Sequence, residues 1–420
     1  MANLDPSALS EAPVRRLTLA QLTSITGDGM VLVALPFAVY GIGGSNGQVG
    51  VALAVQSLAM ALLILLGGAI GDRFDRRRVA VAADLLRFGA RAAIAVLLVL
   101  GDATYWQILL AQIAHGAGSA FFYPAMDSLV PEAVRPEQRK KTNALRKMAE
   151  SLGWIVGPAL GAAILVLGSP GWAFALDAGT FLASALLVKG LATPFASPAE
   201  EPSEQQGIGV EIAEGWAAVR RLGWFWRVAL EFAVLNTLVF APFFVFGPAV
   251  AAQSLGGPEA WALILAGLAV GELLGGAFAM KWQPAHPLSA ATTVVALWIA
   301  PLILLATTAP VGLIAVGAAF AGASVAVFET LWETAKQDHS PPHLLSRLNS
   351  FDQLGSFGLV PLGYLLGGLM LGAVGASAAL LVGAAILAVA TFSVATDPSI
   401  RRVKLGAAQG SGRLALVAGK

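Results

Sequence analysis

The stretch "GGAIGDRFDRRRV", residues 67–79, places six charged residues within seven positions, from Asp72 to Arg78. The sixteen residues before Gly67 carry no charge. Only 12% of the chain is charged, against about 25% in soluble domains. Charge concentrated in a short turn between long apolar runs is typical of a chain that crosses a membrane repeatedly as helices.

Apolar runs long enough to cross a bilayer as helices recur along the chain, because a helix needs about 20 residues to do so. The run lengths favour helices over membrane-barrel strands, which need only about 10 alternating residues. The sequence therefore predicts an all-α membrane protein with twelve transmembrane helices in two six-helix bundles related by pseudo-twofold symmetry. We place the helices at residues 17–42, 48–70, 79–100, 105–126, 146–168, 171–189, 228–250, 259–280, 289–307, 310–334, 353–373 and 375–395.

The basic residues occupy every second gap between these runs and both tails, whereas the alternate gaps hold none. The positive-inside rule then places both termini and the basic loops in the cytoplasm. The chain has no cysteine, and its four histidines lack metal-ligand spacing, so we expect no metal site. No P-loop and no nucleophile–base set indicates catalysis, so we expect neither an enzyme nor catalytic residues.

The two halves of the chain match at a constant offset of 206 residues. Asp127 corresponds to Glu333 and Asn143 to Asn349, matches less expected by chance than those of glycine or alanine. Parallel repeats of this kind place a substrate path on their shared axis. We expect an N-terminal bundle (1–189), a cytoplasmic linker with an amphipathic helix (190–227), a C-terminal bundle (228–398) and a cytoplasmic tail (399–420).

The charged turn is similar to a signature of the major facilitator superfamily, G-x-x-x-D-R-x-G-R-R. It is carried here by Gly68, Asp72, Arg73, Arg76 and Arg77, with Asp75 in place of the second glycine. The fifth run resembles the G-x-x-x-G-P-x-x-G-G pattern of the antiporter branch, through Gly153, Gly157, Pro158 and Gly161. The opening "SITGDGMVLVALPFAVY" also resembles bacterial multidrug, macrolide and siderophore exporters of that superfamily.

This resemblance implies proton-coupled efflux of a small, amphipathic organic molecule by alternating access. A proton-coupled uptake symporter is the alternative, and a non-transporting membrane receptor or scaffold is a more remote one. The resemblance further implies no cofactor beyond the proton gradient, a small-molecule substrate and the lipid bilayer as partners, no nucleic acid, function as a monomer, and location in the bacterial cytoplasmic membrane.

The two signatures also imply roles for their residues. Asp72 is expected to form a conformational latch with Asp127 at the end of the fourth helix, Asp127 being paired with Arg76 or Arg77. The glycines of the fifth helix repeat every four residues and share one face. They serve either ordinary helix packing or a mobile interface with the eighth helix.

Ionisable residues inside the apolar runs are costly and therefore mark candidate sites. We expect the proton to be carried by Asp28, Glu272 or Glu329. Asp84 and Arg87 are interpreted as a structural pair, and Glu231 and Glu333 as residues at the membrane interface. The candidates for the substrate cavity are Arg87, Arg91, Phe122, Asn236 and Phe328.

Overall fold

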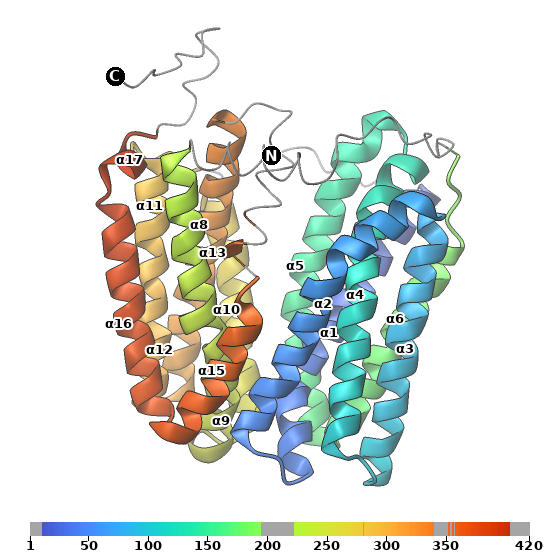
Figure 1. Cartoon of the computed structure of the whole chain (residues 1–420), viewed down its shortest axis with the longest axis horizontal. Helices are drawn as coiled ribbons and strands as arrows, with labels where there is room; N and C mark the ends of the chain where they lie inside the picture. Colours follow the sequence, from blue (N-terminus) through green and yellow to red (C-terminus); the bar gives the residue numbers. More distant parts are fainter. Residues whose placement is uncertain are drawn as a thin grey trace, which may run out of the picture.

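The computed structural model describes residues 11–194, 222–279, 281–339, 352, 355–356 and 358–403. It forms two helical bundles side by side (Figure 1). The first contains α1 (Ala12–Gly41), α2 (Asn46–Arg73), α3 (Arg76–Leu100), α4 (Tyr105–Ala133), α5 (Pro136–Leu167) and α6 (Pro170–Lys189). The second contains α8 (Gly223–Leu235), η2 (Asn236–Phe240), α9 (Ala241–Ser254), α10 (Pro258–Ala279), α11 (Pro287–Val294), η3 (Val295–Trp298), α12 (Ile299–Ala306), α13 (Val311–His339), α15 (Val360–Ala373), α16 (Ala376–Ala395) and α17 (Pro398–Arg401).

The helices follow the expected spans closely. Two spans are interrupted without a break in the chain: η2 is a π-helical stretch between α8 and α9, and η3 is a 3₁₀ stretch between α11 and α12. Counting each as one segment, and leaving aside the four-residue α17, the described residues contain the expected twelve. The expected amphipathic helix of the linker falls largely within residues 195–221, which lie outside the described part.

Helices α4 and α5 extend beyond their apolar runs, to Ala133 and from Pro136. Among the described residues, nine helical segments are long and apolar enough to cross a membrane by themselves. Helices α3 and α4 are not among them, and α15 is shorter, with 14 residues. Their place in the bundle is therefore set by packing against neighbours and not by hydropathy alone.

The charged turn within residues 72–78 joins α2 to α3. Asp75 caps α3, because its carboxylate accepts a hydrogen bond from the backbone N–H of Arg78 at 3.1 Å. Its φ of −54° is an ordinary value, so the turn does not need the glycine of the superfamily signature. At the other end of α3, Gly101 adopts a φ of +81° and ends the helix in the left-handed conformation.

The two bundles contact each other mainly through α2 with α15 and through α5 with α10. A Cβ atom on Gly50 of α2 would lie 2.5 Å from the carbonyl oxygen of Tyr364 on α15. One on Gly368 would lie 3.0 Å from the Cα of Gly47. Glycine thus brings the two backbones into contact at the end of the molecule opposite α17, and the bundles diverge toward the α17 end (Figure 1).

Candidate functional site

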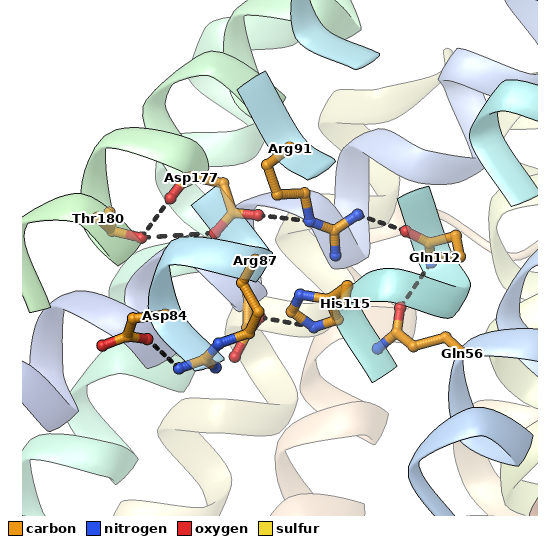
Figure 2. A network of polar contacts seen from close by, with 9 residues as sticks. Gln56, Asp84, Arg87, Arg91, Gln112, His115, Asp177 and Thr180 are labelled. Carbon is orange, nitrogen blue, oxygen red and sulfur yellow. Dashed lines mark hydrogen bonds and ion pairs between the residues drawn. The ribbon is translucent and has the colours of Figure 1, made fainter. Parts of the chain in front are cut away.

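A group of charged side chains lies inside the N-terminal bundle, between α1, α3, α4 and α6. We call it the N-terminal charge network, and it consists of Asp28, Asp84, Arg87, Arg91, His115 and Asp177. Arg87 and Asp84 form an ion pair within α3, and both side chains are fully buried. Arg91, one turn further along α3, pairs with Asp177 of α6 at 2.9 Å (Figure 2). The expected Asp84–Arg87 pair is thus present.

Arg91 also connects the network to two further helices. Its guanidinium donates to the side-chain oxygen of Gln112 on α4. The amide of Gln112 in turn donates to the oxygen of Gln56 on α2 at 2.6 Å (Figure 2). A charged side chain buried in this way is stable only when its hydrogen-bonding capacity is largely met, so these amides fix the position of Arg91.

Asp28 of α1 contacts a histidine that sequence reasoning did not select. The Nε2 atom of His115, on α4, lies 3.2 Å from an Asp28 oxygen. The imidazole packs against the ring of Phe181 with 5.5 Å between centroids. His115 follows Gln112 by three residues on an otherwise apolar helix face, and this polar pair is the signal that could have identified it.

Three of the candidate cavity residues, Arg87, Arg91 and Phe122, belong to this network or pack against it. The guanidinium of Arg87 lies between the rings of Phe122 and Phe181, 4.0 and 4.3 Å from their centroids. In this arrangement all three candidates are buried inside the N-terminal bundle. Aromatic faces around a guanidinium stabilise its charge away from water.

The remaining cavity candidates lie in the C-terminal bundle. Phe328 is buried and stacks on Phe232, with ring centroids 3.8 Å apart. Asn236 begins the π-helical stretch η2, and its side-chain amide donates to the backbone oxygen of Ser356 at 2.8 Å. It therefore joins span seven to the segment that precedes α15.

Glu272 on α10 and Glu329 on α13 lie apart from Asp28 and belong to a second group. Glu272 interacts electrostatically with Glu329. Both also interact with Lys147 and Glu150 of α5, in the other bundle. Lys147 and Glu150 form an ion pair of 3.1 Å. Three carboxylates and one ammonium group therefore face each other across the boundary between the bundles.

A cavity of about 420 Å³ adjoins this second group on the N-terminal side. It is formed by α1, α4 and α5 and combines aromatic, amide and charged side chains. The lining residues are Gln21, Ile25, Tyr123, Asp127, Asn143, Arg146, Lys147, Glu150 and Trp154. Its size suits a small organic molecule, and its polar groups could orient one.

The latch expectation is wrong in its pairing of Asp127. Asp127 contacts Arg146 of α5 at 2.9 Å, while Arg76 reaches Glu132, more than one turn further along α4, at 2.8 Å. Arg77 donates to the backbone oxygen of Leu191 at 2.9 Å. The side chains of the other latch candidates, Asp72 and Arg73 with the neighbouring Gly68, lie outside the described part.

The glycine stripe of α5 faces α1, so the expectation that it meets the eighth helix is wrong for the glycines. A Cβ atom on Gly157 would lie 2.5 Å from the carbonyl oxygen of Thr26, and one on Gly161 2.6 Å from that of Met30. Gly153 meets the side chain of Ile25, and Pro158 packs against Gly29. Helix α5 does contact α10, the eighth helix, but by a different face. The described residues contain no group of three or more potential ligands that could hold a metal ion.

Comparison with known proteins places this arrangement among transporters. A sequence profile described as "Major Facilitator Superfamily" matches residues 17–351. The multidrug efflux pump Tap of Mycolicibacterium fortuitum is 25% identical over 381 residues, 88% of this chain and 91% of Tap. The enterobactin exporter EntS of Citrobacter koseri is 27% identical over 203 residues, 48% of each chain. Among solved structures, the nucleoside transporter NupG superimposes with a TM-score of 0.72 at 12% identity, covering 91% of this chain and 98% of NupG.

Proposed function

This chain belongs to the major facilitator superfamily, and we propose that it exports a small amphipathic organic molecule across a bacterial cytoplasmic membrane in exchange for protons. Tap, which matches most of this chain, is named a multidrug efflux pump. EntS, which matches about half of it, is named an enterobactin exporter. The direction of transport in these relatives supports efflux over uptake. It is a transporter and not an enzyme.

The orientation follows from the charges. Basic side chains cluster at the end of the molecule that carries α17 and the turn between α2 and α3, so this end faces the cytoplasm under the positive-inside rule. The bundles meet at the opposite end, through α2 and α15. The structure then corresponds to a state open toward the cytoplasm, in which the cavity beside α5 receives the substrate. The chain acts as a monomer in the bilayer, with bundles 1–189 and 228–398, linker 190–227 and tail 399–420, and needs no cofactor beyond the proton gradient.

The observation that carries proton coupling is the charge balance of the N-terminal network. Three carboxylates (Asp28, Asp84 and Asp177) face two arginines, and each arginine has its own carboxylate within the network. Among the described residues, the third carboxylate, Asp28, makes its direct contact with His115, while Arg87 and Arg91 act on it from further away. One proton on this pair makes the network neutral, whereas its loss leaves a net negative charge in a region that excludes water. We therefore place the transported proton on the Asp28–His115 pair.

The second acidic group supports a role in coupling and recognition. Glu272 and Glu329 lie at the boundary between the bundles, beside the cavity, where a substrate with a positive group would offset their charge. Because Lys147 belongs to the other bundle, entry of such a substrate changes an electrostatic contact between the halves. Alternating access requires a change of this kind, in which binding favours one arrangement of the bundles over the other.

The proposal is tested in everted membrane vesicles with a panel of amphipathic fluorescent compounds. Addition of a substrate to energised vesicles should release protons, and a protonophore should stop accumulation. Asp28→Asn should abolish substrate-driven proton movement while leaving membrane insertion intact, and Asp102→Asn, in the loop between α3 and α4, is the matched control. Accumulation that ignores the protonophore would refute proton coupling, and proton movement in the uptake direction would favour the symporter alternative.

A further inference from the structure

Glu231, on α8 in the C-terminal bundle, is a buried acid that the proposed mechanism leaves unused. It is 4% exposed, so its side chain is buried within the bundle. Neither carboxyl oxygen has a hydrogen-bond partner in the described part of the chain. Each carboxylate of the N-terminal network, by contrast, has a cationic or imidazole neighbour.

Among the described residues, no charged side chain forms an ion pair with Glu231. Helix α8 packs against α16, η2 and α17, and neither α16 nor η2 contains a titratable residue. At the cytoplasmic end of α8, Arg227 on α8 and Asp397 at the start of α17 pair with each other in a contact of 2.5 Å. The aromatic residues of α8 also reach α13, where Lys336 and Glu333 pair with each other.

A free hydroxyl lies at a similar depth on the neighbouring helix. Buried threonines elsewhere in the bundle, such as Thr292 on α11, donate to the backbone oxygen one turn back. Thr391 on α16 is buried and has no such partner. At about 1.5 Å per residue, Glu231 and Thr391 lie within about 6–9 Å of the Arg227–Asp397 contact that joins their helices. The described residues here thus offer a buried free hydroxyl group, and the cation one turn away on α8, Arg227, is already paired with Asp397.

An ionised carboxylate in such surroundings carries a large desolvation cost, whereas the protonated acid carries a small one. We propose that Glu231 is a proton-binding site of the C-terminal half, held as a neutral carboxylic acid in the arrangement seen here. Its position supports a role in the transport cycle, because one turn further along span seven the backbone enters the π-helical stretch η2. Short π-helical stretches of this kind occur frequently at functional sites.

Each bundle would then contain a proposed proton-binding site: the Asp28–His115 pair in the first and Glu231 in the second. When the bundles rearrange and water reaches α8, Glu231 loses its proton, and when the present packing returns it must regain one. This exchange rests on the proposed function, since it presumes a proton-coupled cycle. The protonated state of Glu231 in the present arrangement does not depend on it.

Infrared difference spectroscopy of the purified protein at neutral pH tests the protonated state directly. The spectrum of the wild type minus that of Glu231→Gln should contain the carbonyl band of a protonated carboxyl, and the band should shift in heavy water. Glu259→Gln, at an exposed position at the start of α10, is the matched control and should give no such band. Glu231→Met provides a second variant of similar length, and it should fold because the site holds no charge to lose.

The outcomes separate the two proposals. An unchanged carboxyl band in both Glu231 variants, each folded by size-exclusion chromatography, would overturn the inference. A lost band together with transport that ignores protonophores would leave Glu231 as a protonated site and refute proton coupling. A lost band with reduced substrate-driven proton release in Glu231→Gln vesicles, at normal expression, would support both.

Discussion

Substitution of Gly157 by alanine should weaken both the fold and the proposed Asp28–His115 proton site, because of the contact of α5 with α1. The new Cβ would lie 2.5 Å from the backbone oxygen of Thr26 and 2.8 Å from the Cα of Gly29. Neither atom belongs to a flexible side chain, so the helices must separate by about 0.9 Å to restore an ordinary contact of 3.4 Å. Overpacking of this kind costs about 1–3 kcal/mol, and the better helix propensity of alanine offsets about 1 kcal/mol.

The same displacement reaches the charge network, because Thr26 and Gly29 flank Asp28 in the sequence. A shift of about 0.9 Å of α1 relative to α5 would move Asp28 and so disturb its contact with His115, which at 3.2 Å is already at the long end of the hydrogen-bonding range. We therefore expect Gly157→Ala to lower the melting temperature in detergent and to reduce substrate-driven proton movement in vesicles.

Gly179→Ala is the matched control, since α6 leaves open space around that position and the substitution adds only helix propensity. The two variants should differ in stability by about 1–3 kcal/mol, the overpacking cost alone. If Gly157→Ala proves as stable and as well coupled as Gly179→Ala, the close approach of α1 and α5 has no role in holding the proton site.

Three further substitutions test other parts of the structure. Asp177→Asn leaves the charge of Arg91 buried and unpaired, which should cost about 3–5 kcal/mol and reduce the monodisperse fraction in fluorescence-detected size exclusion. Hydrogen bonds from Ser399 hold the pKa of Asp397 below its ordinary value of 3.8. The stability that this carboxylate provides should therefore be constant above pH 3.8 and be lost as the pH falls below it. Melting curves of Asp397→Asn should lack this dependence on pH. Gly50→Val adds bulk where α2 meets α15 and should increase the distance between spin labels on the outer ends of the two bundles, for which the cysteine-free chain provides a clean background.

The architecture could be predicted from the sequence because it depends on local properties. Run length places each helix, and the alternation of basic gaps checks the count independently of hydropathy. Even the departure from the superfamily signature at Asp75 could be interpreted, since loss of the glycine indicates a turn without positive φ, and aspartate is a preferred residue for capping the next helix. Helix ends were less predictable, because α4 and α5 continue past the apolar runs under the control of Pro136 and neighbouring turns.

The site could be predicted only in part, because it depends on which helices become neighbours. The i,i+3 spacing of Asp84 and Arg87 predicts their pairing within one helix. The partners of Arg91 and Asp28 come from α6 and α4, and no spacing along the chain reveals them. The same limit applies to Asp127. The sequence indicated Arg76 or Arg77 of the charged turn as its partner, whereas in the structure it pairs with Arg146 of α5.

The internal repeat relates the Asp127–Arg146 ion pair to a contact in the second half. The offset of 206 relates Asp127 to Glu333 and Arg146 to Asp352, so the second half has two acids where the first has an ion pair. Two facing acids would repel, yet Lys336 contacts both, at 2.5 Å from Glu333 and 2.7 Å from Asp352.

Each half therefore ties its fourth helix to the segment that leads into or forms its fifth helix by an ion pair at the end that carries α17, although the residues that supply the charges have changed. Because this tie is present in both halves despite different chemistry, we expect the end of each bundle to move as one body. Motion between states should then be concentrated at the boundary between the bundles, where Lys147 faces Glu272 and Glu329. Replacing Lys336 by methionine should separate Glu333 from Asp352 and loosen only the C-terminal bundle, which hydrogen exchange at α13, compared with α4, would detect.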